Sequence, residues 1–161
     1  MKLAEERHIA AAPDIVWAAL FDTGLLQRCI PGCERLTGDP QAGFDLVVLQ
    51  GVGPVSARFA GRIVVSQLVD GVSLRIDSEG QGGVAGFAKG GANVALAVAS
   101  DGTLLTYQVD AAVGGRIGQL GGRIIDGFAR GLAGQFFDRF KACVEGTGPP
   151  PRKSWLQRLL G

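Results

Sequence analysis

Histidine, cysteine and long apolar runs are scarce in this chain, and each scarcity excludes a class of protein. The 161 residues include one histidine, His8, and three cysteines. An odd number of cysteines argues against a framework of disulfide bonds. No apolar stretch approaches the ~20 residues that a membrane-spanning helix needs. The first residues are charged and do not form the apolar centre of a signal peptide. We therefore expect a cytoplasmic protein.

Charge of one sign is not in excess either. The formal net charge is +1, which argues against a nucleic-acid-binding protein. The basic residues are unevenly placed, because the stretch after Gly148 contains arginine and lysine but no acid. The chain has no GxxxxGK[ST] phosphate loop, since Lys89-Gly90 is followed by glycine and alanine. We therefore exclude nucleotide binding of that kind.

Groups suited to acid–base catalysis are few. His8 falls on an expected first strand, and no Ser-His-Asp set can form without it. Asp77, Glu79 and Asp110 fall on the polar phase of their strands, which faces solvent. We therefore expect no catalytic residues and a protein that is not an enzyme.

Cys29 and Cys33 flank Ile-Pro-Gly, giving a CxxxC spacing. This is neither the CxxC spacing of redox proteins nor a normal zinc-binding spacing. We interpret the segment as a tight turn between two small thiol side chains, and we expect no metal site.

Two periodicities divide the rest of the chain. Apolar and polar residues alternate in three segments, which predicts antiparallel strands with one buried face: 55–67, 72–79 and 105–113. A strand at 3–11 and two short helices, beginning at Pro13 and near Leu25, precede them. From 117 to 143 apolar residues recur every three or four positions, which predicts one long helix.

Glycine is abundant where regular structure is expected. It supplies six of the twelve residues in the run 80–91, and it recurs through the predicted helix 117–143. Glycine weakens both strands and helices, so its use here requires a bend, a close approach or an open space. We expect the missing side chains to leave a cavity between helix and sheet.

Several short motifs occur in an order that resembles the CoxG family, named for the G subunit of carbon monoxide dehydrogenase, within the START-like (SRPBCC) superfamily. The motifs are Cys29-Ile-Pro-Gly-Cys33, Val52-Gly-Pro-Val55, Gly80-Gln-Gly-Gly83, Gly86-Phe-Ala-Lys-Gly90, Val113-Gly-Gly-Arg116, Gln119-Leu-Gly121, Ile125-Asp126 and Gln135-Phe-Phe137. The resemblance covers roughly residues 1–144. It implies an α+β helix-grip fold, in which a curved antiparallel sheet surrounds a long C-terminal helix and leaves a hydrophobic cavity.

The resemblance also implies a function. Proteins of this family accompany molybdenum hydroxylases of the carbon monoxide dehydrogenase type without being their catalytic subunits. They have been linked to membrane attachment of the enzyme and to carrying a hydrophobic quinone. We therefore expect a quinone or similar isoprenoid lipid as bound ligand, no covalent cofactor, and weak, reversible contact with the inner face of the cell membrane.

This interpretation divides the chain into three parts. We expect a START-like domain over 1–145, a Gly/Pro-rich linker over 146–151, and a short basic amphipathic tail over 152–161. The expected inward-facing residues of the cavity are Trp17, Phe59, Phe87, Tyr107, Leu120, Ile124 and Phe128. Tyr107 has a hydroxyl that could donate a hydrogen bond to a quinone carbonyl. The tail residues expected to contact a membrane or a partner are Arg152, Lys153, Trp155, Leu156, Arg158, Leu159 and Leu160.

Two alternatives stay open at this point. The chain could be an adaptor that recruits the enzyme to the membrane without any ligand, its tail binding lipid or a protein groove. It could also be an enzyme of the cyclase or hydratase type on the same fold, with His8 as the reactive group.

Overall fold

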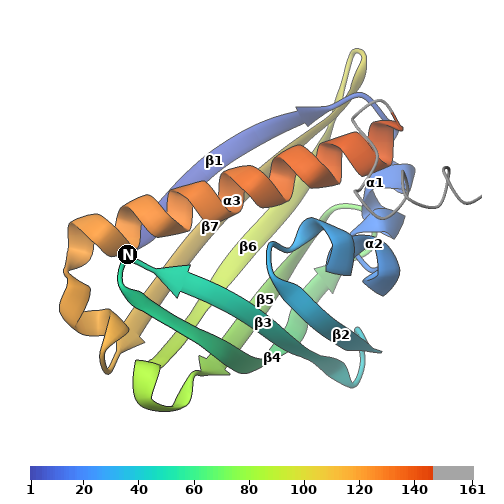
Figure 1. The fold of residues 1–161 in the computed structure, drawn as a ribbon. Helices are drawn as coiled ribbons and strands as arrows, with labels where there is room; N and C mark the ends of the chain where they lie inside the picture. Colours follow the sequence, from blue (N-terminus) through green and yellow to red (C-terminus); the bar gives the residue numbers. More distant parts are fainter. Residues whose placement is uncertain (147–161) are drawn as a thin grey trace, which may run out of the picture.

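The computed structural model describes residues 1–146 as a strongly curved sheet with one long helix lying across its concave face (Figure 1). Residues 147–161 lie outside the described residues, and with them all of the expected tail 152–161 and most of the expected linker 146–151. The elements are β1 (Lys2–Ile9), α1 (Pro13–Ala19), α2 (Thr23–Cys29), β2 (Cys33–Asp39), β3 (Gly43–Val52), β4 (Val55–Val69), β5 (Ser73–Gln81), η1 (Gly83–Ala85), β6 (Phe87–Ala99), β7 (Gly102–Gly114), η2 (Ile117–Leu120) and α3 (Gly122–Glu145).

The seven strands within residues 1–146 form one antiparallel sheet in the order β1-β7-β6-β5-β4-β3-β2. From β2 to β7 each strand pairs with the next along the chain, and β1 closes the far side by pairing with β7. The alternation read in 55–67 is confirmed, since Val55 is buried and its neighbour Ser56 is exposed. The arrangement is the expected α+β helix-grip fold.

The first two helices begin where local chemistry favours a helix start. Pro13 occupies the first helical position of α1, where its missing N–H costs nothing. A carboxylate oxygen of Asp22 accepts a hydrogen bond from the Leu25 amide at 3.1 Å, which caps α2. The segment at Asp22 therefore starts the second helix as well as ending the first.

The long helical pattern after residue 117 is divided in two. Gly121 has a φ of +93°, which separates the short 3₁₀ turn η2 from α3. Helix α3 then runs to Glu145, and Gly146 ends it in the left-handed conformation with φ +67°. The expected single helix of 117–143 is thus a turn followed by a helix that extends two residues further.

Two separate groups of apolar side chains hold α3 to the sheet. The larger group lies at the C-terminal end of α3, around Phe140, Ile9 and Leu105, none of which is exposed to solvent. The smaller group lies at the N-terminal end and consists of the buried residues Val52, Val55, Ala85 and Ile117. Full burial of a side chain of this size stabilises a fold by about 1.5–3 kcal/mol. The two groups fix the ends of the helix and leave its middle over the open part of the sheet.

Candidate functional site

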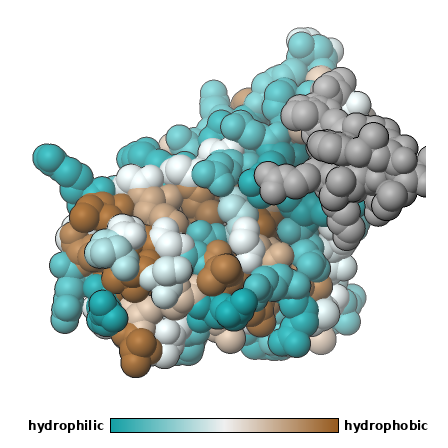
Figure 2. All heavy atoms as spheres, in the orientation of Figure 1, coloured by the Kyte–Doolittle hydropathy of each residue, from teal (hydrophilic) through white to brown (hydrophobic). Residues whose placement is uncertain are grey.

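A cavity of about 590 Å³ lies between α3 and the concave face of the sheet. This is within the ~300–1,000 Å³ that ligand pockets usually have. The middle of α3 forms one wall with the apolar residues Phe128, Ala129, Leu132, Ala133 and Phe136. Strands β3 to β7 form the floor, and the α2–β2 turn at Ile30 and Pro31 forms the rim on the other side. Figure 2 shows hydrophobic residues gathered on this face of the molecule, over the N-terminal half of α3 and the strands below it.

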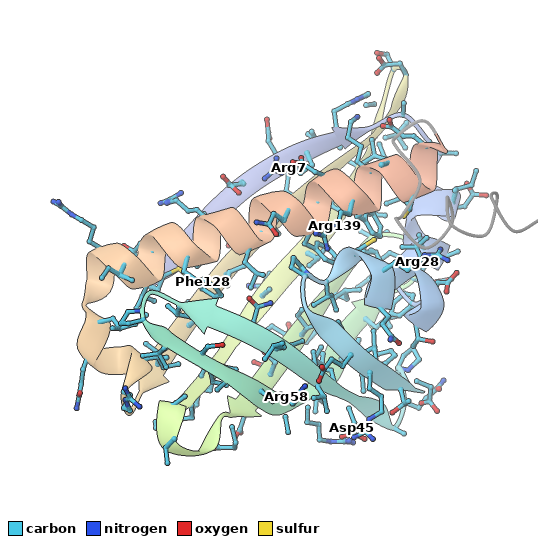
Figure 3. All side chains as sticks on the ribbon, viewed as in Figure 1. Arg7, Arg28, Asp45, Arg58, Phe128 and Arg139 are labelled. Carbon is cyan, nitrogen blue, oxygen red and sulfur yellow. The ribbon has the colours of Figure 1, made fainter. Side chains whose placement is uncertain are left out.

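Three of the seven residues expected in the cavity are brought together on its wall. Phe59 lies on β4, Tyr107 on β7 and Phe128 on α3, and all three line the cavity. Phe128 lies between α3 and β3 in the view of Figure 3. Their common feature is a position on the inward phase of a strand or on the sheet-facing side of α3.

The other four residues are placed outside the cavity lining. Phe87 begins β6 on the outward phase and is 42% exposed, because the inward positions of this strand start with its neighbour Ala88. Ile124 is 45% exposed in the first turn of α3 and lies near the hairpin turn at Gly53.

Leu120 and Trp17 are half-buried, and each packs against one of the two core groups rather than lining the cavity. Leu120 packs on the smaller group, beside Ile117. Trp17 packs on the larger group and forms a T-shaped contact with the Phe21 ring, with 5.3 Å between ring centroids. Phe21 itself does line the cavity, so Trp17 lies one layer behind the wall.

The glycines that open the cavity come from the sheet alone. Gly61, Gly80 and Gly90 line the cavity on strands β4, β5 and β6. The glycines of α3 do not, and Gly127 and Gly131 are exposed with nothing within 4 Å of an added Cβ. The expectation that helix glycines thin the packing above the sheet is therefore wrong. The helix contributes space through Ala129 and Ala133, which are small and face inward.

A polar cluster closes the gap between the edge strand β1 and α3. The Tyr107 hydroxyl donates a hydrogen bond to Glu5 Oε1, and Arg7 forms an ion pair with the same carboxylate at 3.4 Å. The Arg7 guanidinium also lies 5.7 Å from the centre of the Phe137 ring, which stacks on Tyr107. Burial, with the hydrogen bond to Glu5 adding to it, raises the pKa of the Tyr107 hydroxyl. Because this hydroxyl already has a partner, Tyr107 contributes its ring to the cavity rather than a free donor.

The remaining candidate reactive groups lie away from the cavity. His8 lies on the outward phase of β1, with its Nε2 atom 2.8 Å from Asp101 Oδ1. Cys29 is fully buried with its sulfur 4.0 Å from that of Cys143, and burial, with Cys143 adding to it, raises the pKa of the Cys29 thiol to about 12. Cys33 donates instead to the Arg35 carbonyl at 3.4 Å. The two cysteines of the CxxxC motif thus face different partners, and neither lines the cavity.

Sequence reasoning missed several residues that line the cavity, notably Ser78 and the α2–β2 turn. Ser78 continues the inward phase of Leu74 and Ile76 on β5, so its placement was readable from the alternation. Pro31 could be found only with the structure, because its approach to the cavity depends on the packing of α2 against α3.

A comparison with protein-family models matches residues 6–145 to the G subunit of carbon monoxide dehydrogenase (CoxG). The chain belongs to the CoxG family. No curated protein sequence matches it closely enough to count as a relative. Among residues 1–146 no helix is both long and apolar enough to cross a membrane.

Solved structures agree with this fold. A conserved protein from Geobacillus kaustophilus is similar with a TM-score of 0.84 and 24% identity, over 91% of this chain and 97% of that one. A protein from Thermus thermophilus has a TM-score of 0.70 and 16% identity, over 92% and 100%. A START superfamily protein from Mycobacterium smegmatis has a TM-score of 0.66 and 16% identity, over 91% and 99%. At these identities the likeness shows the fold, and this CoxG-family chain shares it.

Proposed function

We propose that this CoxG-family protein is a non-catalytic accessory protein of a carbon monoxide dehydrogenase-type molybdenum hydroxylase. In this proposal it holds a quinone or similar isoprenoid lipid in its cavity and links the enzyme to the membrane. The observation that carries the proposal is the cavity of about 590 Å³, whose wall is apolar apart from a few polar groups. Ligand pockets for hydrophobic molecules have this character.

The size of the cavity supports a ligand with one ring and a short length of chain inside. A water-sized group takes up about 30 Å³, so the volume of about 590 Å³ accommodates roughly 20 such groups. A quinone ring with its substituents and one or two isoprene units is of this size. A longer isoprenoid chain would have to leave the cavity between α3 and the strands.

The chemistry assigned to the chain is binding and shielding. A quinone becomes a hydroquinone by taking up two electrons and two protons, and in this proposal the partner enzyme supplies the electrons. Asp77 and Asp110 are exposed on the outer face of the sheet, and Glu5, which is on the inner side, is already bound by Tyr107 and Arg7. The cavity wall thus supports holding a ligand better than transforming one.

Residues 152–161 supply the proposed membrane contact. Three basic residues contribute about 3 kcal/mol at an anionic surface. Four partly buried apolar side chains add roughly 4–6 kcal/mol, and fixing the backbone of about seven residues at the surface costs about 7 kcal/mol or more. The small net free energy favours reversible visits to the membrane at its inner face over permanent anchoring.

A vesicle-transfer experiment tests both parts of the proposal. The full chain is mixed with anionic vesicles that contain a quinone, the vesicles are pelleted, and quinone in the supernatant is measured. We expect quinone to appear in the supernatant with the protein. We also expect a chain without residues 149–161 to bind quinone added in detergent but to extract it from vesicles more slowly. Failure of the full chain to carry quinone under either condition, with vesicle binding and enzyme recruitment intact, would leave a ligand-free adaptor as the function.

A further inference from the structure

The floor of the cavity has a bare area where the inward positions of neighbouring strands are unusually small. Ser78 on β5 pairs across the sheet with Gly90 on β6, and Gly80, the next inward residue of β5, pairs with Gly61 on β4. The flanking inward positions on β6 and β7 are alanines, Ala88, Ala92 and Ala111. All of these residues line the cavity. The sheet therefore presents an area of backbone and small side chains with one hydroxyl in it.

Of the inward-facing glycines Gly61, Gly80 and Gly90, two are explained by the path of the backbone. A Cβ on Gly61 would lie 2.7 Å from the Glu79 carbonyl oxygen, and one on Gly90 would collide with the Asp110 carbonyl oxygen. At both positions only glycine fits the close approach of adjacent strands.

Gly80 has no such explanation. A Cβ there would make only ordinary contacts, at 3.9 Å from the Ala60 carbonyl oxygen and 3.9 Å from the Phe59 Cβ. Gly80 also does not have the positive φ that would require glycine. Glycine weakens a strand, so its presence at a site that tolerates a larger residue points to space kept for something other than the fold. The Phe59 ring borders this space, since a Cβ on neighbouring Gly82 would strike it.

Ser78 is the one inward-facing polar side chain of the lining that has no partner among residues 1–146. Gln50 donates through Nε2 to the Pro31 carbonyl, and the Tyr107 hydroxyl donates to Glu5. The amino group of Met1 donates to the Ala111 carbonyl at 2.9 Å. Glu79 and Lys89 also border the cavity, but their side chains are exposed on the outer face of the sheet. A ligand that covers this floor removes water from the Ser78 hydroxyl, which costs free energy unless the ligand itself accepts the hydrogen bond.

We propose that the bare floor around Gly80 and Ser78 binds the ring of the ligand, and that the Ser78 hydroxyl donates a hydrogen bond to a carbonyl oxygen on it. The ligand class is a planar ring that bears a carbonyl group, with an apolar chain extending toward α3. This inference rests on the proposed function and assigns its specificity to two residues. The small residues of the floor leave room for a ring against the backbone, and Ser78 selects a carbonyl over a hydrocarbon.

The experiment compares two ligands on matched variants by equilibrium dialysis. One ligand is a benzoquinone that carries a short alkyl chain, and the other is an alkylbenzene of the same chain length without carbonyl groups. The variants are Ser78→Ala and Gly80→Val, with Gly80→Ala as a milder change. Ser56→Ala is the control, since Ser56 is exposed on the outer face of β4. Thermal unfolding of each variant verifies that it is folded.

We expect Ser78→Ala to weaken quinone binding by roughly three- to ten-fold, the worth of one hydrogen bond between neutral groups. Binding of the alkylbenzene should stay within about two-fold, because it makes no such hydrogen bond. Gly80→Val should weaken quinone binding more than Gly80→Ala does, since each added methyl group occupies the floor. The control should bind both ligands as the wild type does.

The outcomes separate this inference from the proposed function. Wild-type protein that binds neither ligand would overturn the proposed function. Wild-type protein that binds the quinone, with Ser78→Ala binding it equally well, would overturn the role of Ser78 and leave the proposed function standing. A loss in Ser78→Ala that is equal for both ligands would also overturn it, because it would reflect the shape of the cavity rather than a hydrogen bond.

Discussion

Filling the cavity from the helix side should raise the stability of the protein, whereas the same change in its packed core should lower it. Ala129 lines the cavity on α3, and Ala19 is 8% exposed within the larger core group on α1. Both are helical alanines, so Ala→Leu changes helix propensity by a similar small amount at each. The two substitutions therefore differ mainly in the space that meets the new side chain.

The magnitude follows from the three carbon atoms that leucine adds. At about 0.8 kcal/mol for each buried carbon, less about 0.5–1 kcal/mol of side-chain entropy, Ala129→Leu should raise the free energy of unfolding by about 1–2 kcal/mol. The added atoms occupy roughly 90 Å³ at about 30 Å³ each, which the cavity of about 590 Å³ can hold. At Ala19 the side chain meets a filled core, and overpacking costs about 1–3 kcal/mol.

Urea denaturation of the delipidated wild type and both variants measures these changes, and quinone binding is measured in parallel. We expect Ala129→Leu to be more stable and to bind quinone less tightly than the wild type. If Ala129→Leu lost as much stability as Ala19→Leu, the space under α3 would be packed in solution. The reasoning from cavity to ligand would then be refuted.

Three further predictions follow from local geometry. Gly127→Ala should raise the free energy of unfolding by about 0.5–1 kcal/mol, because the site is helical and open. Gly121→Ala should lower it, because Gly121 has a φ of +93° that alanine adopts only with strain. Thermal denaturation measures both, and a change of stability in the same direction for the two variants would contradict this prediction. The unfolded chain loses the Cys29 proton near pH 9 and the folded chain near pH 12, so stability should fall as pH rises through this window. Urea titrations of Cys29→Ala at several pH values should show a shallower fall, and an unchanged slope would be inconsistent with the raised pKa. Tyr107→Phe should lower the free energy of unfolding by about 1.5–3 kcal/mol, because it removes a hydrogen bond to the charged carboxylate of Glu5. A variant as stable as the wild type would show that this bond contributes nothing.

The fold was readable from the sequence because its signals are local. The alternation in β4, the hairpin turn at Gly53, and proline at the start of α1 each depend on a few neighbouring residues. The break at Gly121 was not readable, since several glycines occur in that stretch and only the structure shows which one takes a positive φ.

The cavity could be predicted only in part, because a sequence pattern indicates which face of a strand a side chain lies on but not how deeply that side chain is buried. Phase on a strand identifies Phe59 and Tyr107 as inward-facing. Depth depends on contacts between distant segments, which place Leu120 in a core group and Ile124 at the surface. For the same reason the partner of the Tyr107 hydroxyl, Glu5 on the far end of the chain, could not be found from spacing.

Native mass spectrometry of the full chain after exposure to quinone-containing vesicles tests the central claim most directly. The account predicts one bound quinone per chain, and it predicts that Ala129→Leu retains less of it under the same conditions. A protein that emerges from these vesicles, and from its native membrane extract, with no bound lipid would contradict the claim that the cavity exists to hold one.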